Sequence, residues 1–242
     1  MDSPRPTVAI TGASGALGQA LLRRWHRRGA ELIAISHSAA ALTLQADDGT
    51  TVPLQQLQWQ TGQEQELLSQ LQGVDVLVLN HGINRQNQRS AAATAEALEV
   101  NALSSWRLLE GFASLVANRS AAERAQRPRP EVWVNTSEAE VEPAFSPLYE
   151  ISKRLLGQLL SLRGLDLSRQ VRVRRLVLGP FRSALNPAGV MPVAFVADQV
   201  LRQADLGCNL IIVTPNPVMY VLMPLTCLGR WAYNRLLTRG DG

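Results

Sequence analysis

Cysteine, lysine and aromatic residues are all scarce in this chain of 242 residues, which has two cysteines, one lysine and 5% aromatic residues. The two cysteines, Cys208 and Cys227, are too few for a disulfide framework or a structural zinc site. We expect buried free thiols in a reducing compartment, so the protein is predicted to be cytoplasmic and to hold no metal. The N-terminus lacks a basic segment followed by an apolar run, so no secretory signal is expected.

Positive charge is not concentrated in one part of the chain. The net charge is +4, the arginines are scattered, and aromatic residues do not interleave with them. Nucleic-acid binding requires basic charge focused on one face together with stacking aromatics or a recognisable module. We therefore expect no nucleic-acid partner. The hydrophobic content of 46% is that of a globular protein and excludes a disordered or fibrous chain.

The single lysine, Lys153, is informative because 23 of the 24 basic residues are then arginines. Arginine has been used wherever a positive charge is enough. An ammonium is a compact charge with three rotatable donors, which a planar guanidinium cannot replace. We interpret Lys153 as chemically required, with arginine bias and chance as the alternative.

Apolar segments of two kinds alternate along the chain. Strand-like runs occur at residues 7–11, 31–36, 52–59, 74–80, 131–137, 171–179 and 209–214, and helical spacing occurs at 17–28, 63–71, 91–118, 146–163 and 195–205. The polar stretch 119–130 is expected to be a surface loop. This alternation predicts the α/β class, with a doubly wound parallel sheet covered by helices on both faces in three layers.

The C-terminal segment has no charged residue from 206 to 229, and Arg230, Arg235 and Arg239 follow. Three prolines interrupt the run, so a membrane-spanning helix is not expected. Residues 218–237 could form an amphipathic helix on a membrane surface or a partner, or a terminal helix folded onto its own domain. We expect one catalytic and cofactor-binding domain over 1–215 and an apolar helix within 216–242.

A glycine-rich turn, TGASGALG at residues 11–18, follows the first strand and opens the first helix. Glycine lets backbone N–H groups approach a pyrophosphate, and the helix N-terminus then faces its charge. Gly12, Ser14, Gly15 and Leu17 are the expected cofactor-binding residues. A tight turn without a ligand is the alternative interpretation.

A tyrosine and the only lysine lie four residues apart in the predicted helix, as Tyr149 and Lys153, so they share one face. An ammonium near a phenol stabilises the phenolate and lowers its pKa, and such a pair can act as a general acid–base. Ser137 ends the strand EVWVNTS, where ligands of parallel sheets bind. Its hydroxyl could hydrogen-bond an oxygen on which charge develops, although a lone serine there is more often a cap or turn.

These three signals in this order resemble the short-chain dehydrogenase/reductase family in its short single-domain form, over nearly the whole chain. The resemblance implies a Rossmann fold and hydride transfer between a bound nicotinamide dinucleotide and a carbonyl or alcohol. Tyr149 would protonate the oxygen, Ser137 would hydrogen-bond it, and Lys153 would lower the pKa of Tyr149 while contacting the nicotinamide ribose.

Further matches to the family give further expected roles. Asn80 and Gly82 stand where the family lines the adenosine side of the cofactor. Asn101 falls at the family's helix asparagine, which connects the lysine to solvent through water. The segment LGPFRS at residues 178–183 resembles the family's segment after strand six, and it implies nicotinamide binding by Pro180, Phe181 and Ser183.

The sequence departs from the family pattern in several places. The glycine motif is TGxxGxxG, with Gly15 and Ala16, a spacing commoner in the extended and atypical branches. The extended branch carries a longer C-terminal substrate domain, so the short form is expected here. Gln60 replaces an acidic residue that touches adenine. The spacing from Ser137 to Tyr149 is a residue short, which leaves Thr136 as an alternative to Ser137, and the 119–130 stretch resembles an insertion.

The end of the second strand bears on cofactor choice. A carboxylate there would bind the ribose 2′-hydroxyl of NAD and repel a 2′-phosphate. The sequence has Ser36, His37 and Ser38 instead, so NADP is favoured over NAD. His37 could equally be a solvated loop residue.

The resulting hypothesis is an NADP(H)-dependent oxidoreductase with a small-molecule substrate, a hydrophobic carbonyl or alcohol because the expected pocket loop 184–193 is apolar. The family resemblance implies a homo-oligomer. A catalytically silent NADP(H)-binding redox sensor or scaffold is the alternative, since Glu138, Glu140 and Glu142 follow Ser137 and could obstruct a carbonyl pocket. A third possibility is a membrane-surface enzyme that acts on lipid-like substrates.

Overall fold

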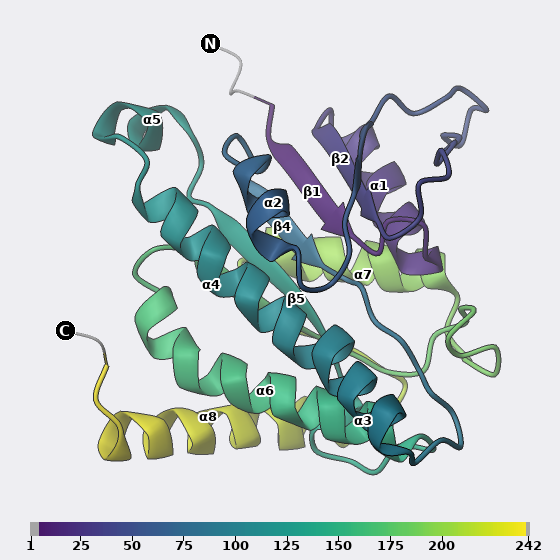
Figure 1. Cartoon of the computed structure of the whole chain (residues 1–242), viewed down its shortest axis with the longest axis vertical. Coiled ribbons are helices and arrows are strands. Elements are labelled where there is room, and N and C mark those ends of the chain that lie inside the picture. Colours follow the sequence, from purple (N-terminus) through teal and green to yellow (C-terminus); the bar gives the residue numbers. More distant parts are fainter. Residues whose placement is uncertain (1–4, 241–242) are drawn as a thin grey trace.

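The computed structural model describes residues 5–240, which form a seven-stranded sheet with helices on both faces (Figure 1). The strand order is β3-β2-β1-β4-β5-β6-β7, and every neighbouring pair is parallel. The strands are β1 (Thr7–Thr11), β2 (Glu31–Ser36), β3 (Gln55–Gln58), β4 (Val76–Leu79), β5 (Glu131–Ser137), β6 (Arg172–Leu178) and β7 (Leu210–Val213). The order reverses between β1 and β4, so the predicted doubly wound α/β fold is confirmed.

The helices are α1 (Ala16–Arg27), α2 (Glu64–Ser69), α3 (Ala91–Leu98), α4 (Ser104–Ala117), α5 (Ala121–Gln126), α6 (Pro147–Leu167), α7 (Val193–Asp205) and α8 (Met219–Leu237), with a π-helical segment η1 (Glu99–Leu103) and a 3-10 turn η2 (Glu138–Glu140). Helices α1 and α7 pack together on one face of the sheet. Helices α2, α4, α6 and α8 cover the other face.

The sheet is buried on both faces, which explains its uninterrupted apolar strands. Successive side chains of a strand point to opposite faces, so Val8 and Ile10 join the cluster under α1 and α7, whereas Ala9 joins the cluster under α4 and α6. Trp133 and Phe112 are the largest fully buried side chains, one in each cluster. The edge strand β3 is shorter than expected because only Gln55–Gln58 pair with β2.

The stretch 119–130, expected to be a loop, contains the short helix α5, so that expectation is wrong in part. Ser120 accepts a hydrogen bond from the backbone N–H of Glu123, and the Glu123 carboxylate accepts one from the N–H of Ser120. This reciprocal capping box satisfies two N–H groups that a helix start leaves free. The spacing Ser-x-x-Glu was a signal for it in the sequence.

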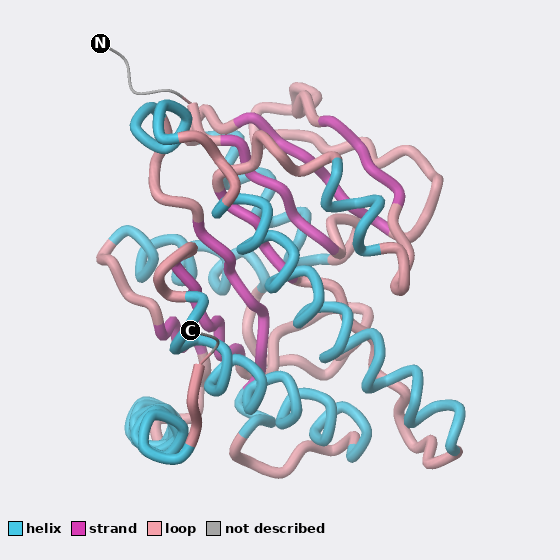
Figure 2. The backbone as a smooth tube through the Cα atoms, turned by 60° about the vertical axis from the view of Figure 1, so that its left-hand side comes forward, coloured by secondary structure: helices cyan, strands magenta, loops and turns pink. Residues whose placement is uncertain are grey.

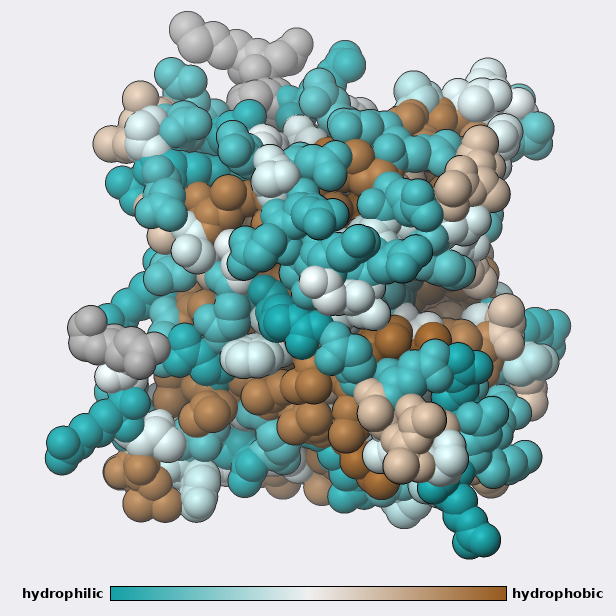
Figure 3. All heavy atoms as spheres, in the orientation of Figure 1, coloured by the Kyte–Doolittle hydropathy of each residue, from teal (hydrophilic) through white to brown (hydrophobic). Residues whose placement is uncertain are grey.

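Helix α8 lies beside α6, and Figure 2 views it almost end-on. Within residues 5–240, no helix has the length and apolar character needed to cross a bilayer. Figure 3 shows hydrophobic side chains gathered over α6 and α8. Cys208 and Cys227 are free thiols, as expected, but they are partly rather than fully buried.

Removing the Phe112 ring tests the core beneath α4. Phe112 is 0% exposed, so Phe112→Ala should lower the free energy of unfolding by about 3–5 kcal/mol, through lost transfer energy and the cavity left behind. Phe145→Ala is the matched control, since that ring is fully exposed and its loss should cost about 0.5 kcal/mol or less. Urea unfolding of both variants measures the difference, and equal losses would contradict this packing.

Candidate active site

The residues expected to carry chemistry meet at the carboxyl ends of β1, β4 and β5. A ladder of hydrogen bonds joins these ends: the Asn80 amide donates to the carbonyl of Gly12 at 3.4 Å, and the Asn135 amide donates to the Asn80 side-chain oxygen at 2.9 Å. The Lys153 ammonium then donates to the carbonyl of Asn135 at 2.9 Å. The glycine turn and the lysine of α6 are thus parts of one site, at the edge where parallel sheets bind ligands.

The glycine turn has room for backbone alone. Gly12 has φ +62°, and a Cβ there would lie 2.9 Å from the Cα of His81. A Cβ on Gly18 would lie 2.4 Å from the carbonyl oxygen of Gly12. Gly15 caps α1 without a side-chain hydrogen bond, and no acidic residue occupies the first turn, so the helix N–H groups are free to meet an anion. This arrangement fits a dinucleotide pyrophosphate.

Ser14 and Leu17, the other two expected cofactor-binding residues of the glycine turn, differ in the exposure of their side chains. Ser14 is exposed beside the turn, whereas the side chain of Leu17 is buried among α1 and the sheet. Leu17 can therefore reach a cofactor only through its backbone.

Tyr149 and Lys153 lie on one face of α6, as the spacing predicted. The Lys153 ammonium is 5.6 Å from the centre of the Tyr149 ring, and Lys153 is only 4% exposed. Burial lowers the pKa of Lys153 to about 8, against a smaller raising effect of the Glu140 carboxylate. Burial of an ammonium is costly without partners, so this placement is the most demanding feature of the site.

The pKa of the Tyr149 phenol is raised from its ordinary value, and the lowering effect expected of Lys153 stays a prediction. Burial raises this pKa most, a hydrogen bond with Ser137 lowers it, and the Glu138 carboxylate raises it further. The ammonium of Lys153 is directed to the Asn135 carbonyl instead. A raised pKa favours the phenol, which is the form that donates a proton, whereas the phenolate, the form that removes one, needs positive charge close by.

The structure separates Ser137 from its neighbour Thr136. The Ser137 hydroxyl accepts from the N–H of Ala139 at 3.2 Å and also hydrogen-bonds Tyr149. The hydroxyl of Thr136 donates to the carbonyl of Leu176 at 3.1 Å, within the sheet and away from the phenol. Only Ser137 thus stands where it can share an oxygen with Tyr149.

The three glutamates after Ser137 are each engaged by another part of the chain. Glu138 accepts from the Thr214 hydroxyl at 2.6 Å, and Glu142 accepts from the Asn216 amide at 2.8 Å. The Glu140 carboxylate lies 3.4 Å from the Arg175 guanidinium. Burial raises the pKa of Glu140, against the lowering effect of Arg175.

Asn101 is completely buried in the π-helical segment η1, a geometry frequent at functional sites. Its side chain accepts from the N–H of Ile83 at 2.8 Å and donates to the Ile83 carbonyl and to the Ser152 hydroxyl. It therefore holds the chain just after Gly82, where a Cβ would crowd the Asn101 oxygen at 3.1 Å. Within residues 5–240, no direct hydrogen bond joins Asn101 to Lys153, so the water-mediated relay stays a prediction.

The other predicted cofactor residues lie on loops. The Ser36 hydroxyl donates to the carbonyl of Ser38, and His37 is exposed. The Ser183 hydroxyl accepts from the N–H of Asn186, inside a loop that folds back so that Phe181 pairs with Met191. The roles of Ser36, His37, Ser38, Pro180, Phe181 and Ser183 stay predictions.

Asn135 was missed in the sequence, whereas His81 belongs to the segment 80–82 that resembles the family and was expected to pack by the cofactor. Asn135 links β4, β5 and Lys153, and the signal was a polar residue near the end of an apolar strand. His81 lies between Thr11, at 2.8 Å, and Ser104, at 2.9 Å, with its ring at 77° to that of Trp59. Burial and the charge of Lys153 lower the pKa of His81 to about 3, so its imidazole is neutral.

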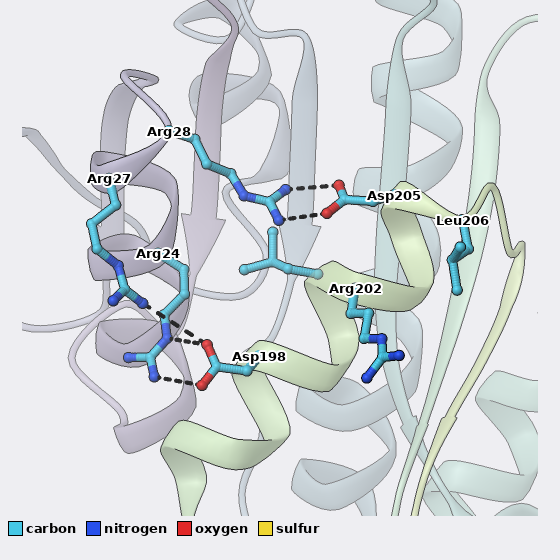
Figure 4. Close-up of a pocket in the computed structure, with 8 residues that line it drawn as sticks. Arg24, Arg27, Arg28, Asp198, Arg202, Asp205 and Leu206 are labelled. Atoms are coloured by element: carbon cyan, nitrogen blue, oxygen red, sulfur yellow. Dashed lines mark hydrogen bonds and ion pairs between the residues drawn. The ribbon is translucent and has the colours of Figure 1, made fainter.

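Two surface hollows lie away from this edge of the sheet. One, of about 440 Å³, lies between α1 and α7, where Arg24 pairs with Asp198 and Arg28 with Asp205 (Figure 4). Those ion pairs satisfy most of its charge. The other, of about 520 Å³, includes Trp133 and Arg174 in its lining. Neither contains Ser137, Tyr149 or Lys153, and the site is assigned from its chemistry.

Comparison with known proteins gives a family and a fold. A model of the NAD dependent epimerase/dehydratase family matches residues 8–159. The monoglucosyldiacylglycerol epimerase of Synechocystis sp. is 46% identical over 219 residues, which cover 90% of this chain and 51% of that protein. The chain thus spans about half the length of this curated relative.

Solved structures agree on the fold. A short-chain dehydrogenase from Sphingobium yanoikuyae in complex with NADPH matches with a TM-score of 0.77 at 19% identity, over 98% of each chain. One from Burkholderia cenocepacia in complex with NADP matches with a TM-score of 0.74 at 19% identity, over 99% of this chain and 100% of that chain. These likenesses confirm the Rossmann-type sheet.

A methyl group added at Gly18 tests whether the glycine turn binds the phosphates of the cofactor. Gly18→Ala places a Cβ against the Gly12 carbonyl and Ala13, so the turn must move, and NADPH affinity should fall ~10-fold or more. Gly164→Ala is the control, because nothing lies within 4 Å of a Cβ there. Fluorescence titration with NADPH measures both variants, and an unchanged affinity in Gly18→Ala would exclude this turn as the phosphate site.

Proposed function

The chain belongs to the NAD dependent epimerase/dehydratase family, and from that premise we propose that it is an NADP(H)-dependent oxidoreductase whose acid–base residue is Tyr149. The observation that carries the proposal is the meeting of Ser137, Tyr149 and Lys153 beside the glycine turn. The hydroxyl and the phenol share a hydrogen bond, and the ammonium lies 5.6 Å from the ring. An anion-binding turn and an acid–base group thus lie at the same edge of the sheet. This combination suits hydride transfer to or from the carbon of a carbonyl or alcohol.

A bound nicotinamide dinucleotide supplies the hydride acceptor and donor. Gly12, Gly15 and the free N–H groups of α1 would hold its pyrophosphate. Tyr149 holds a proton at its phenol oxygen and delivers it to a carbonyl oxygen, or removes it from a hydroxyl in the reverse direction. Ser137 hydrogen-bonds that same oxygen and orients it. Lys153, positioned by the Asn135 carbonyl, supplies positive charge next to the phenol as it becomes a phenolate.

NADP is the proposed cofactor in preference to NAD. The end of β2 has hydroxyls and an imidazole at Ser36, His37 and Ser38 and lacks a carboxylate that would repel a 2′-phosphate. His37 is exposed and free to turn toward such a phosphate. Solved relatives in complex with NADP and NADPH support the proposal.

The proposed substrate is a sugar hydroxyl on a glycolipid, and the proposed outcome is epimerisation. The support is the 46% identical relative, which is an epimerase of monoglucosyldiacylglycerol. In such a reaction a carbinol carbon would give its hydride to the oxidised dinucleotide, and its hydroxyl would give its proton to Tyr149 in the phenolate form, which leaves a ketone. Return of hydride to the opposite face and of the proton to oxygen gives the epimer, with no net oxidation. The hydrophobic substrate expected from the sequence accords with a lipid. A cytoplasmic location and a homo-oligomer stay predictions.

Removal of the Tyr149 hydroxyl tests the proposed acid–base role. Tyr149→Phe should lower turnover ~10²–10⁴-fold, because the proton donor is lost, and should leave NADPH affinity unchanged. Tyr233→Phe, on exposed α8, is the matched control and should keep full turnover. Product analysis with a glycolipid substrate and an NADPH titration measure both. Tight NADPH binding by the wild type without turnover of any carbonyl, alcohol or glycolipid would favour the silent sensor or scaffold instead.

The source of the hydrogen at the inverted carbon tests the hydride route. With monoglucosyldiacylglycerol in D2O, the epimer should contain no deuterium on that carbon and the cofactor should show no net change in absorbance. The reason is that the same hydride leaves and returns, and a hydrogen bound to carbon of the cofactor does not exchange with water. Mass spectrometry of the released sugar reads the deuterium. Solvent deuterium on the inverted carbon would overturn the hydride route.

A further inference from the structure

The outward face of α8 is apolar although no described part of the chain covers it. Helix α8 buries Met219, Met223 and Asn234 against the domain. Large apolar side chains stand exposed along the rest of this segment: Val218, Tyr220, Val221, Leu225, Leu228, Trp231, Tyr233, Leu236 and Leu237. A contiguous exposed patch of this kind marks a contact surface, whereas scattered exposed leucines do not.

The patch continues onto the neighbouring helix. Ile151 and Leu162 of α6 are also exposed, and Figure 3 shows the hydrophobic side chains gathered over α6 and α8 in the view of Figure 1. The two helices pack side by side, so they present one surface rather than two. We call this surface, made by the exposed apolar residues of α6 and α8, the α8 face.

The charged residues of the C-terminal segment have one sign, whereas Glu150 and Asp166 of α6 are paired with Arg154 and Arg163. Residues 206–240 contain no aspartate or glutamate, and Arg230, Arg235 and Arg239 stand in the second half. The Arg235 guanidinium lies 5.3 Å from the Trp231 ring, and that of Arg230 lies 5.5 Å from the Tyr233 ring. Tryptophan and tyrosine favour the boundary between hydrocarbon and water, and arginine attracts anionic headgroups. The combination is complementary to an anionic lipid surface.

Helix α8 is tied to the loop of the proposed active site. Two of the glutamates that follow Ser137 accept hydrogen bonds from Thr214 and Asn216, just before α8, and the Tyr220 hydroxyl donates to the Thr214 carbonyl. Phe145, three residues after Glu142 in the same loop, is fully exposed. A surface that holds α8 therefore also holds the loop between Ser137 and the start of α6.

We propose that the α8 face docks on an anionic lipid bilayer and holds the active-site loop at the membrane surface. The choice of a lipid partner rests in part on the proposed function, because a diacylglycerol glycoside resides in a bilayer. A second copy of the chain fits less well. A parallel pairing of two such segments would bring six arginines close, and in either orientation residues 206–240 of the second copy offer no acidic residue to these arginines.

Vesicle flotation of the full chain tests the docking. The probes are vesicles of phosphatidylcholine alone and of phosphatidylcholine with phosphatidylglycerol in equal parts, both free of glycolipid. The wild type should float with the anionic vesicles and stay behind with the neutral ones, and added salt should reduce its binding. Absence of binding to anionic vesicles at low salt would overturn the proposal.

Substitutions on the α8 face locate the contact. Leu225→Glu with Leu228→Glu should lower the bound fraction ~10-fold or more, because two carboxylates replace apolar contacts and repel the headgroups. Arg235→Gln should lower the partition coefficient about five-fold. Leu206→Glu is the matched control, since Leu206 is also more than half exposed but follows α7 on the other face of the sheet, and it should bind as the wild type does. Equal binding by the double variant and the wild type would contradict the assignment to α8.

Docking and catalysis are separable in these experiments. Tyr149→Phe should float like the wild type even though it is inactive. The double variant should keep its NADPH affinity and its activity on a water-soluble glycoside, because the substituted side chains already face solvent. Light scattering measures the oligomeric state of the wild type and of the double variant. If the wild type is a dimer, the double variant is a monomer and neither binds vesicles, then α8 is a subunit interface and the membrane proposal is wrong.

Discussion

The burial of one ammonium at the carboxyl edge of the sheet is the constraint on which the proposed site depends. Lys153 has the Asn135 carbonyl as its hydrogen-bond acceptor and feels the attraction of Glu140. An amine buried in this way loses its hydration, which lowers its pKa to about 8 and keeps it near the point where it can gain or lose a proton. A guanidinium would stay charged and would need more donors satisfied, which explains a lysine in a chain that otherwise uses arginine.

The surroundings of that ammonium form a connected polar network. Asn135 links it to Asn80 and the glycine turn, and Glu140 links it to Arg175, which also donates to the carbonyl of Gly157 on α6. Gly157 is needed there because a Cβ would lie 1.8 Å from the Glu140 carboxylate. Buried networks of this kind hold a geometry when every member is paired, and they fail together when one is removed.

Some features resisted prediction because their causes lie far apart in the chain. The three glutamates after Ser137 suggested an obstructed pocket, but the partner of Glu138 is 76 residues further along. Burial raises the pKa of Tyr149, and the sequence does not show which segments enclose the phenol. Helix α5 differs from these features, because its capping box joins residues three positions apart and can be recognised in the sequence.

By itself the sequence determined the alternation of strands and helices, the glycine turn after β1 and the placement of Tyr149 and Lys153 on one helical face. These features follow from periodicity and from contacts within a few residues. Only the tertiary structure decided that the Asn135 carbonyl receives the lysine, that Ser137 rather than Thr136 meets the phenol, and that α8 turns its apolar side outward. Those outcomes depend on which segments become neighbours after folding, and that is set by the packing of the whole sheet.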